Sequence, residues 1–343
     1  MGAYGMRHVC AGLAFVVLAA GNAAAQSNVS LSLDTRAWGP MAPFFVAVDK
    51  GYYTAQKLDV STELLAGGSG TAETVKRVAA GTNAIGFADI NALIRFRDQN
   101  PGAPIKAVFM VYNRPPYAVV ARKSRGVATP KDLEGKKLGA PNREGSAAQW
   151  PLFAQLAGID ASKVSVENIS LPVRDPMLAA GQVDAVTGYS FSVVADLKDR
   201  GVPQNDLVVF AMKDYGMELY GGAIVVNEKF AAANPEAVKA FLHAYVRALK
   251  ETIKSPSTAI DSVVRRNETA RKEVELERLT MAIRDNILTP EVKTNGFGGI
   301  DAARFDRGIE QLATAYKFRN AKPKLEDIFD GSFLPPAAER KAN

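Results

Sequence analysis

Three short loops that combine glycine with polar side chains recur along the chain. They are Trp38-Gly39-Pro40, Gly68-Ser69-Gly70-Thr71 and Asn142-Arg143-Glu144-Gly145-Ser146. Glycine lets a ligand approach the backbone closely, and Ser or Thr can cap a helix while offering a hydroxyl. In open α/β sheets, ligands lie beyond the carboxyl ends of the strands, where helix starts present free N–H groups. Each loop alone is compatible with an ordinary helix cap, but the three together predict a binding cleft.

The same loops are poor candidates for nucleotide binding. None of them continues with Gly-Lys-Ser or Gly-Lys-Thr, which a phosphate-binding loop requires. Residues 81–86 have the glycine spacing of a Walker loop, but Phe87 follows them. The loops therefore predict a site that holds a ligand rather than one that transfers phosphate.

Aromatic side chains follow several of the predicted strands. Trp38 comes directly after the first strand, where it offers a flat face for stacking on a ligand, with packing at the cleft rim as the alternative. Tyr112 and Tyr189 end later strands and are candidates for the same role. These three residues predict an aromatic component in the site.

Polar side chains follow the strands as well. Asp89 and Asn91 come after the short strand 84–88 and can form hydrogen bonds in the cleft, although Asp89 could instead cap the next helix. Arg143 and Glu144 would contribute from the opposite side, unless they form a solvated ion pair. With Ser146, these residues complete the predicted polar lining.

Few residues could carry catalysis. His8 and Cys10 lie in the N-terminal segment discussed below, which leaves His243 as the remaining histidine and no cysteine. A single histidine on a predicted helix supports neither a Cys/His dyad nor a zinc cluster. Carboxylate pairs such as Asp175 with Asp89 are conceivable, but their spacing does not single them out. We therefore predict no catalytic residue, no metal and no cofactor.

The N-terminus has the pattern of a secretory signal peptide. Arg7 precedes an uncharged run, 9–18, and small residues follow up to Ala25, so cleavage is expected near Gln26. The run is too short for a permanent membrane span. An N-terminal anchor helix is the alternative. We predict export from the cytoplasm.

The charge is mildly basic. The chain has 42 Lys and Arg against 36 Asp and Glu, for a formal net charge of +6. The basic residues are scattered and form no long run, so nucleic acid is not an expected partner. A basic surface does suit the capture of small anions.

Strands and helices alternate at a spacing typical of βα units on a mostly parallel sheet. The pattern is interrupted at 113–116 and again at 212–221, and from 235 onward the chain is predicted to be helical. Two crossings of this kind would join two α/β lobes that can close over a ligand. The predicted boundaries are a signal peptide at 1–25, lobe 1 at 26–112 with 222–321, lobe 2 at 117–211, hinge crossings at 113–116 and 212–221, and a tail at 322–343.

Several segments, taken in order, resemble the SsuA/THI5-like solute-binding proteins. They are VAVDKGYYTAQKLDV, the glycine-serine loop after it, VAAGTNAIGFAD, PKDLEGKKLGAP, MLAAGQVDAVTGY and GGAIVVNEKFAAANPEAVKAFLHAY. The resemblance implies a two-lobed periplasmic binding protein fold of type II, and a monomeric receptor of an ABC importer for nitrate, sulfonates, taurine or aminopyrimidines. Its implied partners are a membrane permease and a cytoplasmic ATPase. It also implies ligand contacts from Trp38, 68–71, Asp89, 143–146 and Tyr189.

Two other functions remain open at the level of sequence. One is a secreted enzyme that acts on a small heterocycle through Asp89 or Glu144, although the histidine and cysteine-rich motif of the related pyrimidine synthase is not matched. The other is a ligand sensor domain. The ligand is open too: helix starts and net positive charge favour an oxyanion, whereas the aromatic residues with Asp89 and Glu144 favour a planar, nitrogen-bearing molecule.

Overall fold

The computed structural model describes residues 1–2, 26–65, 70–142 and 144–342. The predicted signal peptide and three predicted ligand contacts, Gly68, Ser69 and Arg143, lie outside the described residues. No helix among the described residues is long and apolar enough to cross a membrane.

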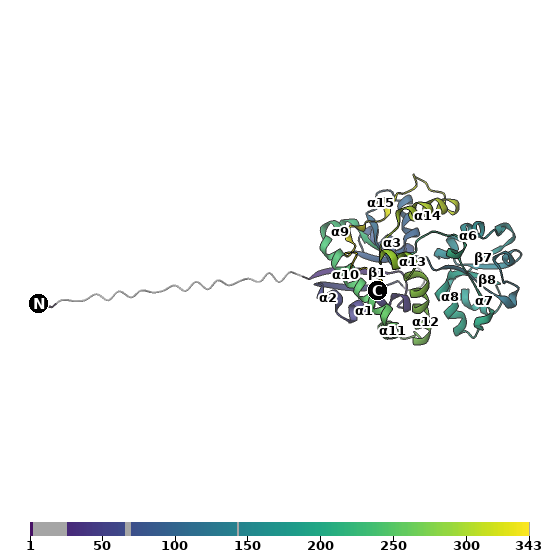
Figure 1. The fold of residues 1–343 in the computed structure, drawn as a ribbon, viewed down its shortest axis with the longest axis horizontal. Helices are drawn as coiled ribbons and strands as arrows, with labels where there is room; N and C mark the ends of the chain where they lie inside the picture. Colours follow the sequence, from purple (N-terminus) through teal and green to yellow (C-terminus); the bar gives the residue numbers. More distant parts are fainter. Residues whose placement is uncertain (3–25, 66–69, 143, 343) are drawn as a thin grey trace.

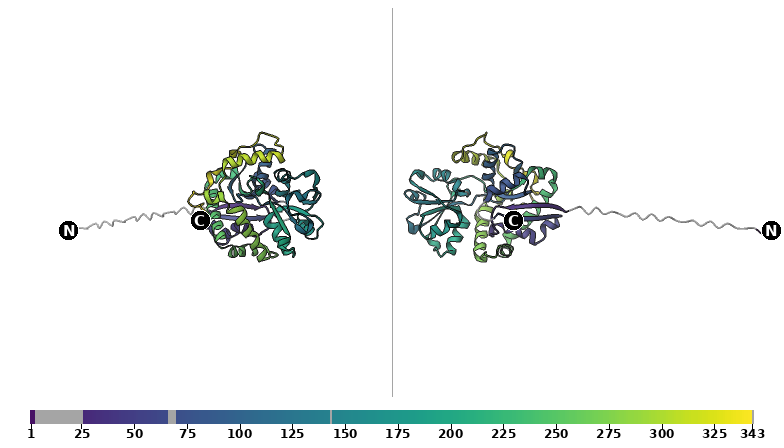
Figure 2. Two further views of the ribbon diagram at one scale, coloured as in Figure 1. Left: turned by 45° about the vertical axis from the view of Figure 1, so that its right-hand side comes forward. Right: turned by 180° about the vertical axis from the view of Figure 1, so that it is seen from behind.

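The described elements form two α/β lobes, seen side by side in Figures 1 and 2. The strands are β1 (Ser27–Leu33), β2 (Leu58–Leu64), β3 (Ile85–Asp89), β4 (Ile105–Met110), β5 (Tyr117–Arg122), β6 (Lys137–Ala140), β7 (Ser165–Asn168), β8 (Ala185–Tyr189), β9 (Leu207–Ala211) and β10 (Gly222–Asn227). The α-helices are α1 (Ala42–Asp49), α2 (Tyr52–Ala55), α3 (Gly70–Ala80), α4 (Ile90–Gln99), α5 (Gly145–Ala148), α6 (Trp150–Leu156), α7 (Leu171–Ala179), α8 (Ser190–Asp199), α9 (Glu228–Ala233), α10 (Pro235–Lys254), α11 (Pro256–Val264), α12 (Lys272–Ala282), α13 (Pro290–Asn295), α14 (Ala302–Ala315) and α15 (Leu325–Ile328).

Each lobe is built on one five-stranded sheet. The order is β2-β1-β3-β10-β4 in lobe 1 and β7-β6-β8-β5-β9 in lobe 2. The α/β fold class predicted from the sequence is confirmed, but both sheets are mixed. β10 is antiparallel to both of its neighbours, and so is β5. These are the two strands that enter a lobe directly from the other one, so they start at the interlobe side while the other strands end there.

The sheets are covered by helices because their strands are apolar on both faces. All residues of β3 and β10 are buried, as expected of central strands in a sheet covered on both sides. Gly86 in β3 permits close packing of α3, since a Cβ there would lie 2.6 Å from the Thr74 side chain. This packing holds the end of β3, and with it Asp89, in a fixed position.

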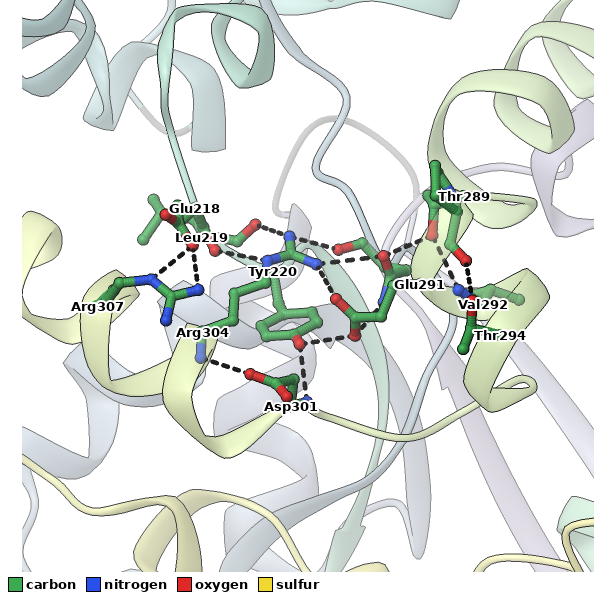
Figure 3. Close-up of polar contacts among 12 residues, drawn as sticks. Glu218, Leu219, Tyr220, Thr289, Glu291, Val292, Thr294, Asp301, Arg304 and Arg307 are labelled. Atoms are coloured by element: carbon green, nitrogen blue, oxygen red, sulfur yellow. Dashed lines mark hydrogen bonds and ion pairs between the residues drawn. The ribbon is translucent and has the colours of Figure 1, made fainter.

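Arg304 of α14 ties the two connections between the lobes together (Figure 3). Its guanidinium donates to the carbonyl oxygens of Glu218 and Leu219 in one connection, at 3.0 and 2.8 Å, and to that of Asn113 in the other, at 2.8 Å. The same group pairs with Glu291 at 2.9 Å and lies 3.9 Å above the Tyr220 ring. The two connections are therefore held side by side by one side chain.

The C-terminal segment is anchored to lobe 1. Ile328 is fully buried, and Phe329 forms a β-bridge with Ala107 of β4. The backbone N–H of Phe297 donates to the carbonyl of Arg340 at 2.8 Å. From its prolines and glycines, the segment 322–343 was predicted only to be a tail on the surface. Its contacts with lobe 1 could not be predicted from those residues.

Candidate functional site

The predicted site residues gather where the strand ends of the two lobes face each other. Asp89 ends β3 and Tyr112 follows β4 in lobe 1, while Tyr189 ends β8 and Glu144 precedes α5 in lobe 2. A Cβ placed on Gly145 would lie 3.1 Å from Asp89 Oδ2, so the loop before α5 directly contacts the end of β3 across the interlobe boundary.

An aromatic cluster spans this boundary. Trp38 and Tyr112 come from lobe 1, and both pack edge-on against Phe191 at the start of α8, with ring centroids 5.3 and 6.1 Å away. Tyr189 packs on Phe191 from the other side at 5.8 Å. Trp38 and Tyr189 keep partial exposure, whereas Phe191 is fully buried. Phe191 was not among the predicted residues.

Asp89 and its neighbours form a hydrogen-bonded group between the lobes. Asp89 Oδ1 accepts from the backbone N–H of Asn91 at 2.8 Å and so caps α4, the alternative role considered for it. Its Oδ2 accepts from the hydroxyl of Tyr117, the first residue of β5. The Asn91 side chain donates to the same hydroxyl and to the carbonyl of Tyr220, and Thr71 Oγ1 accepts from the backbone N–H of Asp89. These side chains fix the strand ends that border the cleft.

Asp34 is a further carboxyl group at the strand ends that the sequence analysis did not name. It directly follows β1, as Asp89 ends β3, and keeps partial exposure. Burial, reinforced by the neighbouring charge of Asp89, raises the pKa of Asp34 from 3.8 to about 8. Burial, and then the neighbouring Asp89, Tyr117, Asp34 and Glu144, also hold the pKa of Tyr189 well above its ordinary value.

Glu144 forms an ion pair with a buried arginine. Arg174 of α7 donates to Glu144 at 2.9 Å and to Asp175 at 2.8 and 3.0 Å. The Arg174 side chain is only 3% exposed. Burial nevertheless raises the pKa of Glu144 to about 7, because Arg174 offsets only part of the desolvation. The solvated ion pair considered for Arg143 and Glu144 involves Arg143, which lies outside the described residues; among the described residues, Glu144 pairs with Arg174.

The ion pairs continue from Arg174 into lobe 1. Ser192 of α8 bridges Arg174 and Asp196, at 3.4 and 3.3 Å. Asp196 pairs with Arg278 of α12, which also pairs with Glu275. Glu275 in turn accepts from the backbone N–H of Gly39, next to Trp38, at 2.7 Å. One chain of polar contacts therefore joins the loop at Trp38 to Glu144 on the opposite wall.

Several buried polar atoms at the site have no hydrogen-bond partner among the described residues. They are Trp38 Nε1, the Tyr112 hydroxyl, Glu144 Oε2 and Ser146 Oγ. Buried polar groups are normally paired with protein, water or a ligand, so these atoms are available to a further hydrogen-bond partner. Gly70 is the first residue of α3 and adopts a left-handed backbone conformation, with φ 58°. It can contribute only backbone atoms to a site.

The remaining candidates for chemistry lie elsewhere. His243 is on α10 and contacts Glu339 at 2.7 Å, on the outer surface of lobe 1. Within the described ranges, no group of three His, Cys, Asp or Glu side chains is arranged to hold a metal. The arrangement at the cleft offers aromatic faces, carboxyl groups and hydroxyls, which suit the binding of a small molecule.

Comparison with known proteins places this geometry in a family. A riboflavin-binding protein, RibY, from Chloroflexus aurantiacus is 27% identical over 86% of this chain and 82% of its own length. A 4-amino-5-hydroxymethyl-2-methylpyrimidine phosphate synthase from Aspergillus parasiticus is 22% identical over 65% of this chain and 66% of its own.

The fold is also that of a solved binding protein. The periplasmic aliphatic sulphonate binding protein SsuA from Escherichia coli superposes with a TM-score of 0.67 at 13% identity, over 85% of this chain and 88% of that one. The family model described as NMT1/THI5 like matches residues 38–259, more than half of the sequence. The chain therefore belongs to the NMT1/THI5-like family.

Proposed function

We propose that this protein is a periplasmic solute-binding receptor of an ABC importer, whose lobes close on a small molecule and present it to a membrane permease. The supporting features are two lobes joined by two connections, aromatic and polar residues from both lobes at their boundary, and the family assignment. A ligand that touches both lobes would stabilise the closed arrangement, since only differential contact with one state shifts the equilibrium.

We further propose that the ligand is planar and carries N–H or O–H donors. The observation that carries this choice is that three carboxyl groups, Asp34 after β1, Asp89 at the end of β3 and Glu144 before α5, stand at the interlobe ends of these elements. An oxyanion placed there would be repelled by any ionised carboxylate of this group, so it would bind best with Asp34 and Glu144 protonated, the forms that their raised pKa values of about 8 and about 7 already favour. Donor groups of a neutral ring system would instead pair with the carboxyl oxygens, and its faces would meet Trp38. The relative from Chloroflexus aurantiacus, which is named for riboflavin binding, supports this chemistry.

A thermal-shift panel tests the proposal, because a ligand that binds only the folded form raises the melting temperature. Riboflavin and lumichrome should raise it, whereas ethanesulfonate, taurine and nitrate should leave it unchanged. A shift with the sulfonates alone would overturn the assigned ligand class but keep the receptor. X-ray scattering with the active compound should then show a smaller radius of gyration, as lobe closure requires.

An enzymatic role is the second candidate, since the Aspergillus parasiticus relative is named as a synthase. Mass spectrometry distinguishes the two functions. Compound incubated with the protein and recovered unaltered supports a receptor, and a new product supports an enzyme.

Trp38 provides a direct test of the aromatic wall. Trp38→Ala should weaken riboflavin binding by about 1 to 3 kcal/mol, the order of a stacking contact with its buried area. Trp38→Phe, which keeps an aromatic face, should retain most of the affinity. Isothermal titration calorimetry measures both variants. Equal affinity of wild type and Trp38→Ala would remove Trp38 from the ligand site and leave it as a packing partner of Phe191.

Asp34 should impose a pH dependence on stability. Its folded-state pKa is about 8 and its ordinary value 3.8, so the folded protein binds one more proton than the unfolded chain between these limits. Its contribution is fully present below about pH 4 and is lost as the pH rises to about 8. Asp34→Asn removes this loss and should be more stable than wild type at pH 8 by about 1 to 3 kcal/mol, a value reduced for the partial exposure of the residue.

Urea unfolding at pH 5 and pH 8 measures the effect. The exposed residue Asp59 offers a matched control, because Asp59→Asn should leave the pH dependence of wild type unchanged. If Asp34→Asn and wild type lose the same stability between the two pH values, Asp34 is not the buried acid described above.

A further inference from the structure

The unpartnered polar atoms at Glu144 and Ser146 continue into lobe 2 with Gln149 and Thr187. Ser146, Gln149 and Thr187 are each 0% exposed. The hydroxyls of Ser146 and Thr187, and both the oxygen and the nitrogen of the Gln149 amide, have no hydrogen-bond partner among the described residues. A buried amide with both ends unpaired costs free energy unless something else satisfies it.

These atoms converge on one face of the lobe 2 sheet. Thr187 points to the same side of β8 as Tyr189, since side chains alternate along a strand. α5 covers that side, because it packs on β5 and β8 and a Cβ on Gly145 would lie 2.9 Å from the Tyr117 ring. Ser146 and Gln149 are three residues apart, so both lie on the buried face of this helical turn. We use the name α5 recess for these four residues, Glu144, Ser146, Gln149 and Thr187.

We propose that the α5 recess binds the imide or lactam edge of a planar heterocycle and so determines which ring systems the receptor accepts. The inference rests on the proposed function and assigns the polar edge of the same ligand. A primary amide such as that of Gln149 offers one acceptor and donors side by side, which pair with an N–H and its adjacent carbonyl. The hydroxyls of Ser146 and Thr187 can donate to the second carbonyl of an imide. The carboxyl group of Glu144 disfavours an anionic ligand group beside it.

Riboflavin and 3-methylriboflavin are a suitable probe pair, because they differ only in the imide N–H. Wild type should bind riboflavin at least about tenfold more tightly, the order of one hydrogen bond lost at a buried site. In Gln149→Met and Thr187→Val, riboflavin affinity should fall and the preference over the methylated compound should shrink towards unity. Calorimetry with both compounds gives the two ratios.

Thr252→Val is a matched control, since Thr252 is also a fully buried threonine with an unpartnered hydroxyl, but lies on α10 of lobe 1. It should keep both the affinity and the preference of wild type. Urea unfolding of each variant separates loss of binding from loss of folding.

The outcomes distinguish the recess from the receptor function. Equal binding of the two flavins by wild type, or a preference that survives in both recess variants, would mean that the recess holds only water. That result overturns this inference and leaves the receptor intact. Binding of neither flavin, with lobe closure on another class of solute, overturns the imide assignment together with the proposed ligand class.

Discussion

Replacing Arg304 by methionine is expected to lower the free energy of unfolding by about 3 to 5 kcal/mol, the usual consequence of removing one partner from a buried charge network. The Arg304 side chain is 12% exposed. It donates five hydrogen bonds, to Glu218, Leu219, Glu291 and twice to Asn113. Methionine fills similar space but leaves three backbone carbonyls and a carboxylate without their donor.

The neighbouring Arg307 provides the control. It lies on the same helix, pairs with Glu218 and is 56% exposed, so Arg307→Met should cost less than about 1 kcal/mol. Arg304→Lys should recover only part of the loss, because one ammonium cannot reach all of these acceptors. Guanidinium unfolding measures the three variants. Equal stability of Arg304→Met and Arg307→Met would mean that Arg304 does not hold the two connections together.

Much of the fold could be predicted from the sequence because the strands and helices alternate and are separated by clear turn and loop signals. In the structure the chain passes from one sheet to the other between β4 and β5 and again between β9 and β10, while the hinge bounds 113–116 and 212–221 stay predictions. The mixed direction of the sheets could have been anticipated as well. A strand that follows a crossing begins at the interlobe side of its sheet. It therefore runs antiparallel to the strands that end on that side.

Part of the site was also accessible. The rule that found Asp89, a polar residue at the end of a buried strand, applies equally to Asp34 after β1, which was overlooked. Phe191 and Arg174 are different. An aromatic residue in the first turn of a helix and an arginine on a helix next to an aspartate are both ordinary surface patterns. Only the packing of the lobes turns the first into part of an aromatic cluster and the second into a buried cation.

Gln149 shows a further limit of sequence reasoning. The sequence of 146–157 indicates a helix interrupted early by Pro151, and the structure divides it into α5 and α6 at Gln149. Pro151 lacks the N–H that would donate to the carbonyl of Ala147, and its ring crowds that carbonyl, so one continuous helix is disfavoured here. A glutamine on a continuous helix suggests a solvated side chain. At the break it is turned inward, and no periodicity in the sequence indicates that.

Arg174→Met is the second variant for which we expect a loss of about 3 to 5 kcal/mol in the free energy of unfolding. The substitution leaves Glu144 and Asp175, 12% and 10% exposed at their side chains, without the cation that neutralises them. The pKa of Glu144, already about 7, should rise further, because burial then acts unopposed by Arg174. Lys137→Met is the control in the same lobe, since Lys137 is 58% exposed and its pair with Glu167 contributes little.

The double variant Arg174→Met with Glu144→Gln decides whether charge or packing is responsible. If the loss comes from the unpaired carboxylate, removing its charge should restore about 1 to 3 kcal/mol relative to Arg174→Met alone, and a double-mutant cycle should give a coupling of that size. Urea unfolding at pH 7 measures all four proteins of the cycle. Additive losses would mean that Arg174 acts through the packing of its aliphatic stem, and that Glu144 reaches the cleft without its support.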